Sequence, residues 1–268
     1  MFPQLNPASS SDRVLSSSQN KVLRNTYLLL AATMVPTVLG AWVGISSGFS
    51  LFAGSPLISF ILFMAIAFGF FYAIEKTKHS VVGVYLLLGF TFFMGLMLSR
   101  LLGFALGLGN GAQLIGLAAG GTGVVFFSMA SLSTVIKKDL SSMGKFLFIG
   151  VILLIVASVA NIWLQMPALM LTISLLAVVI FSLFLLYDLQ RIVNGGETNY
   201  VSATLAVYLN VYNIFSNLLV LLMALFGGSR EQPQNDLGIF LPGAAPYTSG
   251  LFYSKSYGSA AVIPLQDQ

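Results

Sequence analysis

Two polar stretches near the end of the chain carry the side chains that could do chemistry. The first closes an apolar run and contains Asp188 and Arg191, and the second lies inside the next apolar run and contains Asn210, Asn213 and Asn217. An ionisable group at the centre of a lipid bilayer costs about 2.5–3.5 kcal/mol on insertion scales. Such a group therefore faces a partner, a cavity or the membrane surface, which makes these five residues the candidate pore or sensor residues.

Each of these residues also has a purely structural interpretation. Asp188 could end its helix at the membrane surface and pair with Arg191 one turn further on. The three asparagines lie on one helix face at i, i+3 and i+7 spacing, where amide groups could hydrogen-bond to other helices and hold a bundle together. The same face could line a conduction path, and the sequence leaves both interpretations open.

The composition indicates a protein whose surface faces lipid. The chain has 268 residues, of which 57% are hydrophobic and only 7% are charged, whereas a soluble domain carries about 25% charged residues. There is no cysteine, which excludes disulfides, thiolate metal ligands and cysteine nucleophiles. The formal net charge of +4 is explained by the basic loops that orient membrane helices, and it does not imply nucleic-acid binding.

Seven apolar runs are each long enough to cross the hydrocarbon core of about 30 Å. We therefore predict an all-α, polytopic membrane bundle of seven transmembrane helices. The segment Arg100–Ala112 is apolar but too short to span, so it either lies at the interface or extends the third helix, and its glycines at 103, 107 and 111 would supply backbone freedom. The predicted spans are Thr26–Ile45, Pro56–Ile74, Ser80–Leu98, Gln113–Ile136, Lys145–Leu164, Met166–Asp188 and Ala203–Phe226.

The distribution of Lys and Arg predicts the orientation, because these residues are retained on the cytoplasmic side. With the N-terminus inside, nine lie in inner segments (Arg13, Lys21, Arg24, Lys76, Lys78, Lys137, Lys138, Lys145 and Arg191) and three in outer ones (Arg100, Arg230 and Lys255). The polar, serine-rich residues 1–24 are predicted to be a disordered cytoplasmic tail ahead of the membrane domain, residues 25–228. Residues 229–268 are rich in Gly, Pro, Ser and Tyr and are predicted to be a flexible extramembrane C-terminal tail.

Other motifs favour structural roles over chemistry. Gly116, Gly120 and Gly123 are not followed by Gly-Lys-Ser/Thr, so we interpret them as a small-residue surface for close helix packing rather than as a phosphate loop. His79, the only histidine, is predicted to be a solvated loop residue. Glu75 and Glu197, at the inner boundary, could form salt bridges with neighbouring lysines. The sequence contains no nucleophile–base pair and no metal constellation, so we predict no catalytic residue, no enzyme activity, no cofactor and no resident metal.

Several segments, in order, resemble the Bax inhibitor-1 family of seven-helix membrane proteins, and within it the bacterial YccA-type modulators of the FtsH protease. The likeness covers about residues 13–230 and thus the whole predicted membrane domain. The residues after it have no counterpart in the resemblance. The matching segments are Lys21–Tyr27, Gly120–Phe127, Lys138–Ser141, Ala160–Ala168 and Gly195–Tyr200, the last leading into Tyr208 and Tyr212-Asn213-Ile214-Phe215.

The resemblance implies two functions of different classes. The first is a multi-pass protein of the bacterial inner membrane, with a periplasmic C-terminus, that binds an FtsH-type protease through its N-terminal tail and its membrane helices. The alternative is a pH-sensitive Ca²⁺ or cation leak channel gated by two carboxylates that share a proton. Asp188 matches the first of these carboxylates, but the second position holds Asn210, whose amide neither titrates nor brings charge for Ca²⁺.

Overall fold

The computed structural model describes residues 7–49, 56–136 and 140–227. The backbone alone is described for residues 7–19, 56, 57 and 141. The described chain forms seven α-helices and no strand, which confirms the predicted all-α class. The helices are α1 Pro7–Ser46, α2 Pro56–Thr77, α3 Val81–Leu106, α4 Gly111–Val135, α5 Ser141–Leu164, α6 Pro167–Val193 and α7 Tyr200–Phe226. Every one contains a span long and apolar enough to cross a membrane.

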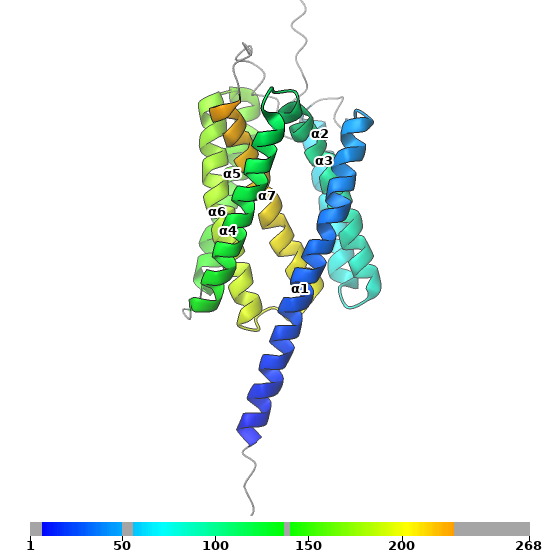
Figure 1. Cartoon of the computed structure of the whole chain (residues 1–268), viewed down its shortest axis with the longest axis vertical. Coiled ribbons are helices and arrows are strands. Elements are labelled where there is room, and N and C mark those ends of the chain that lie inside the picture. Colours follow the sequence, from blue (N-terminus) through cyan, green and yellow to red (C-terminus); the bar gives the residue numbers. More distant parts are fainter. Residues whose placement is uncertain (1–6, 50–55, 137–139, 228–268) are drawn as a thin grey trace, which may run out of the picture.

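The helices pack side by side as one bundle, with α7 at its centre (Figure 1). Helix α7 contacts α1, α2, α3, α4 and α6, and its buried Tyr208 lies in the same core as Phe90 of α3. The outer faces carry large apolar side chains such as Trp42, Phe127 and Phe146, all more than 60% exposed. Because lipid is as apolar as these side chains, the bundle must be held together by close packing and hydrogen bonds rather than by a hydrophobic driving force.

The closest helix contact joins α1 to α3 and depends on glycine. A Cβ atom at Gly40 would lie 2.2 Å from the carbonyl oxygen of Phe92, and one at Gly95 would lie 2.1 Å from the carbonyl oxygen of Thr37. Gly44 meets Ser99 in the same way, with 2.4 Å between its hypothetical Cβ and Oγ. A side chain at any of these glycines would push the two helices apart.

The predicted packing surface on α4 is wrong. A Cβ atom built at Gly116, Gly120 or Gly123 would have no described neighbour within 4 Å other than its own helix backbone and adjacent residues. Helix α4 instead approaches α7 through Gly121, where a Cβ would lie 2.7 Å from Leu218 Cδ2. Spacing alone identified small residues on α4, but the side of the helix that meets a neighbour lies one residue, about 100°, away.

The uncertain segment Arg100–Ala112 extends the third helix. Helix α3 continues to Leu106, and a short turn then leads into α4 at Gly111. Glycine is required there because of a close contact, since a Cβ at Gly111 would lie 1.7 Å from the carbonyl oxygen of Ala105. The backbone freedom that the sequence suggested for this segment is not what the turn uses, because Gly107 has an ordinary φ of −70°.

The first helix begins much earlier than predicted. The sequence predicts a disordered tail up to Arg24, whereas α1 is helical from Pro7, and only its part Asn20–Ser46 qualifies as a membrane span. The leading part of α1 extends beyond the end of the bundle at which the α2–α3 and α6–α7 loops lie (Figure 1). The predicted C-terminal tail, residues 229–268, lies outside the described residues.

Candidate functional site

Asp188 and Asn210 lie together between α6 and α7. These helices form a hairpin joined by residues 194–199, so side chains near the end of α6 face those in the first half of α7. Asn210 donates from Nδ2 to Asp188 Oδ2 over 2.7 Å, and Asn210 is only 5% exposed. The two positions that the resemblance matches to a pair of carboxylates are thus in contact, with a neutral amide at the second one.

Arg191 does not form the predicted ion pair with Asp188. Its Nη2 lies 3.3 Å from Oε2 of Glu197, and its Nε donates to the carbonyl oxygen of Gly196 over 3.3 Å. This geometry arises because the chain turns back directly after α6, with Gly195 at φ +76°, a conformation that favours glycine. The turn places Glu197 beside Arg191, so the charge partner of Arg191 comes from the loop.

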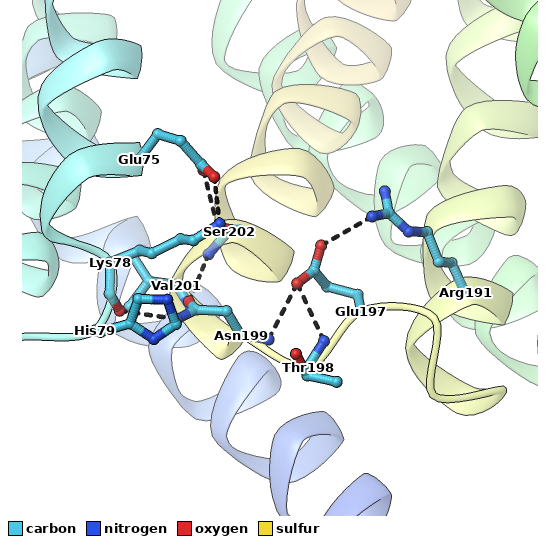
Figure 2. A network of polar contacts seen from close by, with 9 residues as sticks. All are labelled: Glu75, Lys78, His79, Arg191, Glu197, Thr198, Asn199, Val201 and Ser202. Carbon is cyan, nitrogen blue, oxygen red and sulfur yellow. Dashed lines mark hydrogen bonds and ion pairs between the residues drawn. The ribbon is translucent and has the colours of Figure 1, made fainter.

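Glu197 also organises the loop backbone. Its Oε1 accepts hydrogen bonds from the amides of Thr198, at 3.1 Å, and Asn199, at 3.0 Å (Figure 2). The predicted salt bridges of the two boundary glutamates therefore differ in outcome. Glu75 pairs with Lys78 as predicted, whereas Glu197 pairs with an arginine rather than a lysine.

Asn199 joins this loop to the α2–α3 loop. Its Oδ1 accepts from the amides of Val201, at 2.9 Å, and Ser202, at 3.2 Å, which caps the N-terminus of α7. Its Nδ2 donates to the carbonyl oxygen of Lys78 over 2.9 Å and lies 3.4 Å from Nδ1 of His79 (Figure 2). His79 itself is exposed, as predicted, but it borders a buried asparagine rather than solvent alone.

The polar face of α7 is used less uniformly than its spacing suggests. Asn213 donates to the carbonyl oxygen of Leu209 over 2.8 Å, and Asn217 donates to that of Asn213 over 2.8 Å, so both amides bond within their own helix. The bonds from α7 to other helices come instead from Asn210, from two tyrosines, and from the hydroxyls of Ser202, toward Glu75, and Thr204, toward the carbonyl oxygen of Thr26. Tyr208 bonds to Thr37 of α1 over 2.9 Å, and Tyr212 donates to the carbonyl oxygen of Met94 in α3 over 3.3 Å.

Among the described residues, no group of three His, Asp or Glu side chains lies close enough together to hold a metal ion. Asp188 contributes one carboxylate, and its hydrogen-bond partner is an amide, which does not titrate at ordinary pH. The arrangement suits polar contact between helices.

Sequence reasoning did not single out several residues that tie the helices together. Asn199 precedes an apolar run as an N-cap asparagine does, so the capping rule could have identified it. The Gly40-x-x-x-Gly44 and Gly95-x-x-x-Ser99 repeats give a recognisable small-residue signal for the α1–α3 contact. No sequence signal points to Gln190, which is 3% exposed and donates to the carbonyl oxygen of Ile136 at the end of α4 over 2.7 Å.

Comparison with known proteins agrees with this architecture. The family model described as "Inhibitor of apoptosis-promoting Bax1" matches residues 19–228. An uncharacterized protein of Neisseria meningitidis is 40% identical over 212 residues, which cover 78% of this chain and 93% of the relative. A membrane protein of Vibrio cholerae is 38% identical over 220 residues, 82% and 96% of the two chains.

A further relative carries a functional name. The "Modulator of FtsH protease YccA" of Escherichia coli K12 is 37% identical over 215 residues, which cover 80% of this chain and 95% of the relative. The YccA of another Escherichia coli strain, equally similar, is named an inner membrane protein. The match of the family model over the whole seven-helix region and the shared identity over nearly the full length of these relatives show that the chain belongs to the Bax inhibitor-1 family of membrane proteins.

Proposed function

We propose that this protein modulates an FtsH-type membrane protease and engages it through the segment that precedes its first membrane span. The observation that carries the proposal is the helical extension of α1, which begins at Pro7, whereas the membrane span begins at Asn20. Residues 7–19 would extend about 20 Å at 1.5 Å per residue. They project past the bundle, where a membrane-anchored partner could reach them (Figure 1).

The extension suits a protease that must seize an unfolded terminus. Its sequence, PASSSDRVLSSSQ, contains few apolar residues and six serines in two runs of three. An isolated helix of this length is marginal in water, because forming its first turn is unfavourable and no tertiary packing compensates for that cost. The extension can therefore unfold while the membrane bundle stays intact.

The bundle itself would resist extraction. Helix α1 is held to α3 by the glycine contact at Gly40 and Gly95, and to α7 by the bond between Thr37 and Tyr208. Pulling on residues 7–19 would transmit force directly to this tightly packed helix. A protein with an accessible end and a resistant body can occupy the protease and so shield other substrates, in accord with the name of its Escherichia coli relative.

A reconstituted degradation assay tests the proposal. Purified FtsH-type protease degrades a membrane substrate in proteoliposomes, with and without the present protein as competitor. Deletion of residues 2–19 should abolish the competition. Replacement of these residues by a Gly/Ser segment of equal length should preserve it, because the proposal requires a terminus without stable structure rather than a specific sequence. Competition that is undiminished after the deletion, by a protein whose seven membrane spans are still folded, would overturn the proposal.

A second candidate function is a cation or Ca²⁺ leak along the α6–α7 seam. The observation that favours it is the contact between Asp188 and Asn210, which places one carboxylate within a membrane span. Flux of Ca²⁺ into proteoliposomes at pH 6 and pH 8, with Asp188→Ala alongside, tests it. Flux no higher than in protein-free vesicles would exclude the leak, and the deletion of residues 2–19 should leave any flux unchanged.

A further inference from the structure

A cleft of about 400 Å³ opens between the end of α2, the α6–α7 turn and the start of α7. Its mouth carries four charged side chains, Glu75, Lys78, Arg191 and Glu197, together with the hydroxyl of Ser202. None of these groups takes part in the contact between Asp188 and Asn210. Figure 2 shows the mouth from close by, with Glu75 and Ser202 on one side of Glu197 and Arg191 on the other.

The two sides of the mouth present opposite charges. On the α2 side, Glu75 is the more exposed member of its ion pair, with 61% of its side chain accessible against 25% for Lys78. On the α6 side, Arg191 is the more exposed member, with 47% accessible against 19% for Glu197. A ligand entering the cleft therefore meets a carboxylate on one side and a guanidinium on the other.

Both exposed groups retain capacity for a ligand. The Arg191 guanidinium has five N–H donors, and its recorded contacts use Nε, toward Gly196, and Nη2, toward Glu197. A phosphate can accept hydrogen bonds from the remaining donors in the planar geometry that arginine favours. Glu75 accepts from Lys78 through Oε1 and from Ser202 through Oε2 at 3.3 Å, and each carboxylate oxygen has a further lone pair for an ammonium.

The rest of the cleft is apolar and lies further along the helices, toward the membrane interior. Phe71 is one helical turn before Glu75, and Leu205, Ala206 and Leu209 follow Ser202 at i+3, i+4 and i+7 on the same face of α7. Their side chains continue the cleft from its charged mouth along the apolar spans of α2 and α7. The lining thus changes from charged to apolar within about two turns, as the headgroup and acyl chain of a lipid do.

We propose that this cleft binds a zwitterionic phospholipid with a free ammonium group, of the phosphatidylethanolamine type. The phosphate would contact Arg191, the ammonium would contact Glu75, and an acyl chain would lie against Phe71, Leu205 and Leu209. An anionic lipid without an ammonium would contact Arg191 but would bring no cationic group to the carboxylate of Glu75. The inference concerns lipid recognition and does not depend on the protease proposal.

Native mass spectrometry of the purified full-length protein tests this proposal. The protein in detergent is titrated with phosphatidylethanolamine, phosphatidylglycerol or phosphatidylcholine of identical acyl chains. We expect phosphatidylethanolamine to bind about fivefold more tightly than either of the others, since an exposed ion pair contributes up to about 1 kcal/mol. Equal affinity for the three lipids would overturn the proposal.

Variants locate the site and separate its two halves. Glu75→Gln should remove the preference for phosphatidylethanolamine over phosphatidylglycerol. Arg191→Gln should lower the affinity for both lipids about fivefold. Ala206→Phe should block the apolar part of the cleft and lower the affinity for all three lipids while leaving the charged mouth intact. The matched control is Arg100→Gln, in α3 and outside the cleft lining, which should bind as the unmodified protein does.

The source of the headgroup is tested with soluble glycerophosphoethanolamine as competitor. A lipid site predicts weak competition, because the soluble compound lacks the acyl chain that the apolar lining would contact. Competition as strong as that of the intact lipid would overturn the lipid proposal in favour of a soluble zwitterion. A preference for phosphatidylethanolamine that survives both Glu75→Gln and Ala206→Phe would place the lipid elsewhere and would equally overturn it.

Discussion

Asn210 Nδ2 donates a 2.7 Å hydrogen bond to Asp188 Oδ2, across the contact between α7 and α6. The two residues occupy the positions where the family resemblance implies two acids that share a proton. An amide donates without titrating, so no shared proton is needed to hold these two side chains together. Asparagine at position 210 therefore holds the two helices in contact without supplying a second titrating group.

Asn210→Asp should restore a pH-sensitive pair. Two carboxylates in this contact cannot both ionise cheaply, so the folded state would hold a proton that the unfolded state releases. Because the folded state then binds more protons, stability should fall as pH rises. We expect the variant to lose about 1–3 kcal/mol of stability at pH 8 relative to pH 5, beyond any change in the unmodified protein. Thermal unfolding in detergent at both pH values measures this.

The double variant Asp188→Asn with Asn210→Asp is the control for this prediction. It reverses the positions of the acid and the amide and returns the pair to a single carboxylate, so the added pH dependence should disappear. If the double variant kept the pH dependence of Asn210→Asp, a proton shared between the two residues would not be its cause.

Gly95→Ala should weaken the contact between α1 and α3. The added Cβ would lie 2.1 Å from the Thr37 carbonyl oxygen, a backbone atom that cannot move without shifting α1. Overpacking of this kind costs about 1–3 kcal/mol, which should appear as a lower midpoint of thermal unfolding. Gly116→Ala is the matched control, because a Cβ there meets only open space. A loss as large in Gly116→Ala as in Gly95→Ala would show that helix contact is not the reason for the effect.

Asn199→Ala should destabilise the end of the bundle that carries the α2–α3 and α6–α7 loops. The substitution removes both the cap on α7 and the bond to Lys78 O, and loss of an N-cap alone costs about 0.5–2 kcal/mol. Hydrogen exchange of the amides of Val201 and Ser202 should accelerate. Asn199→Asp keeps the capping oxygen but loses the Nδ2 donor, so it should recover the protection of these amides without recovering the bond between the loops.

The orientation prediction can be tested with single cysteines, since the chain has none of its own. His79→Cys lies in the α2–α3 loop and Gly109→Cys in the turn between α3 and α4, at opposite ends of the bundle. If the N-terminus is cytoplasmic, a membrane-impermeant maleimide added to intact spheroplasts should label position 109 and leave position 79 unmodified until the cells are broken. The reverse pattern would contradict the orientation.

The architecture of this membrane protein follows from its amino-acid sequence. Seven apolar runs of sufficient length fix seven helices, because only helices and closed barrels satisfy backbone hydrogen bonds inside lipid. The family resemblance, confirmed by the comparisons, also follows from local residue order. It was local order, too, that placed Asp188 near the end of its helix and Asn210 inside the next one.

Which residues contact each other depends on how the helices pack in three dimensions. The spacing of small residues on α4 predicted close packing at Gly116 and Gly120. The close contacts instead join Gly40 and Gly95 to the backbones of the facing helices. The reason is that the rotation of each helix about its axis is set by all of its neighbours. Arg191 follows Asp188 by one helical turn, but the chain reversal at Gly195 places Glu197 beside Arg191, and these two residues form the ion pair. The apolar runs indicate how long each helix is and in which order the helices follow. The contacts of a side chain depend instead on the distances between helices, which the periodicity within one helix does not specify.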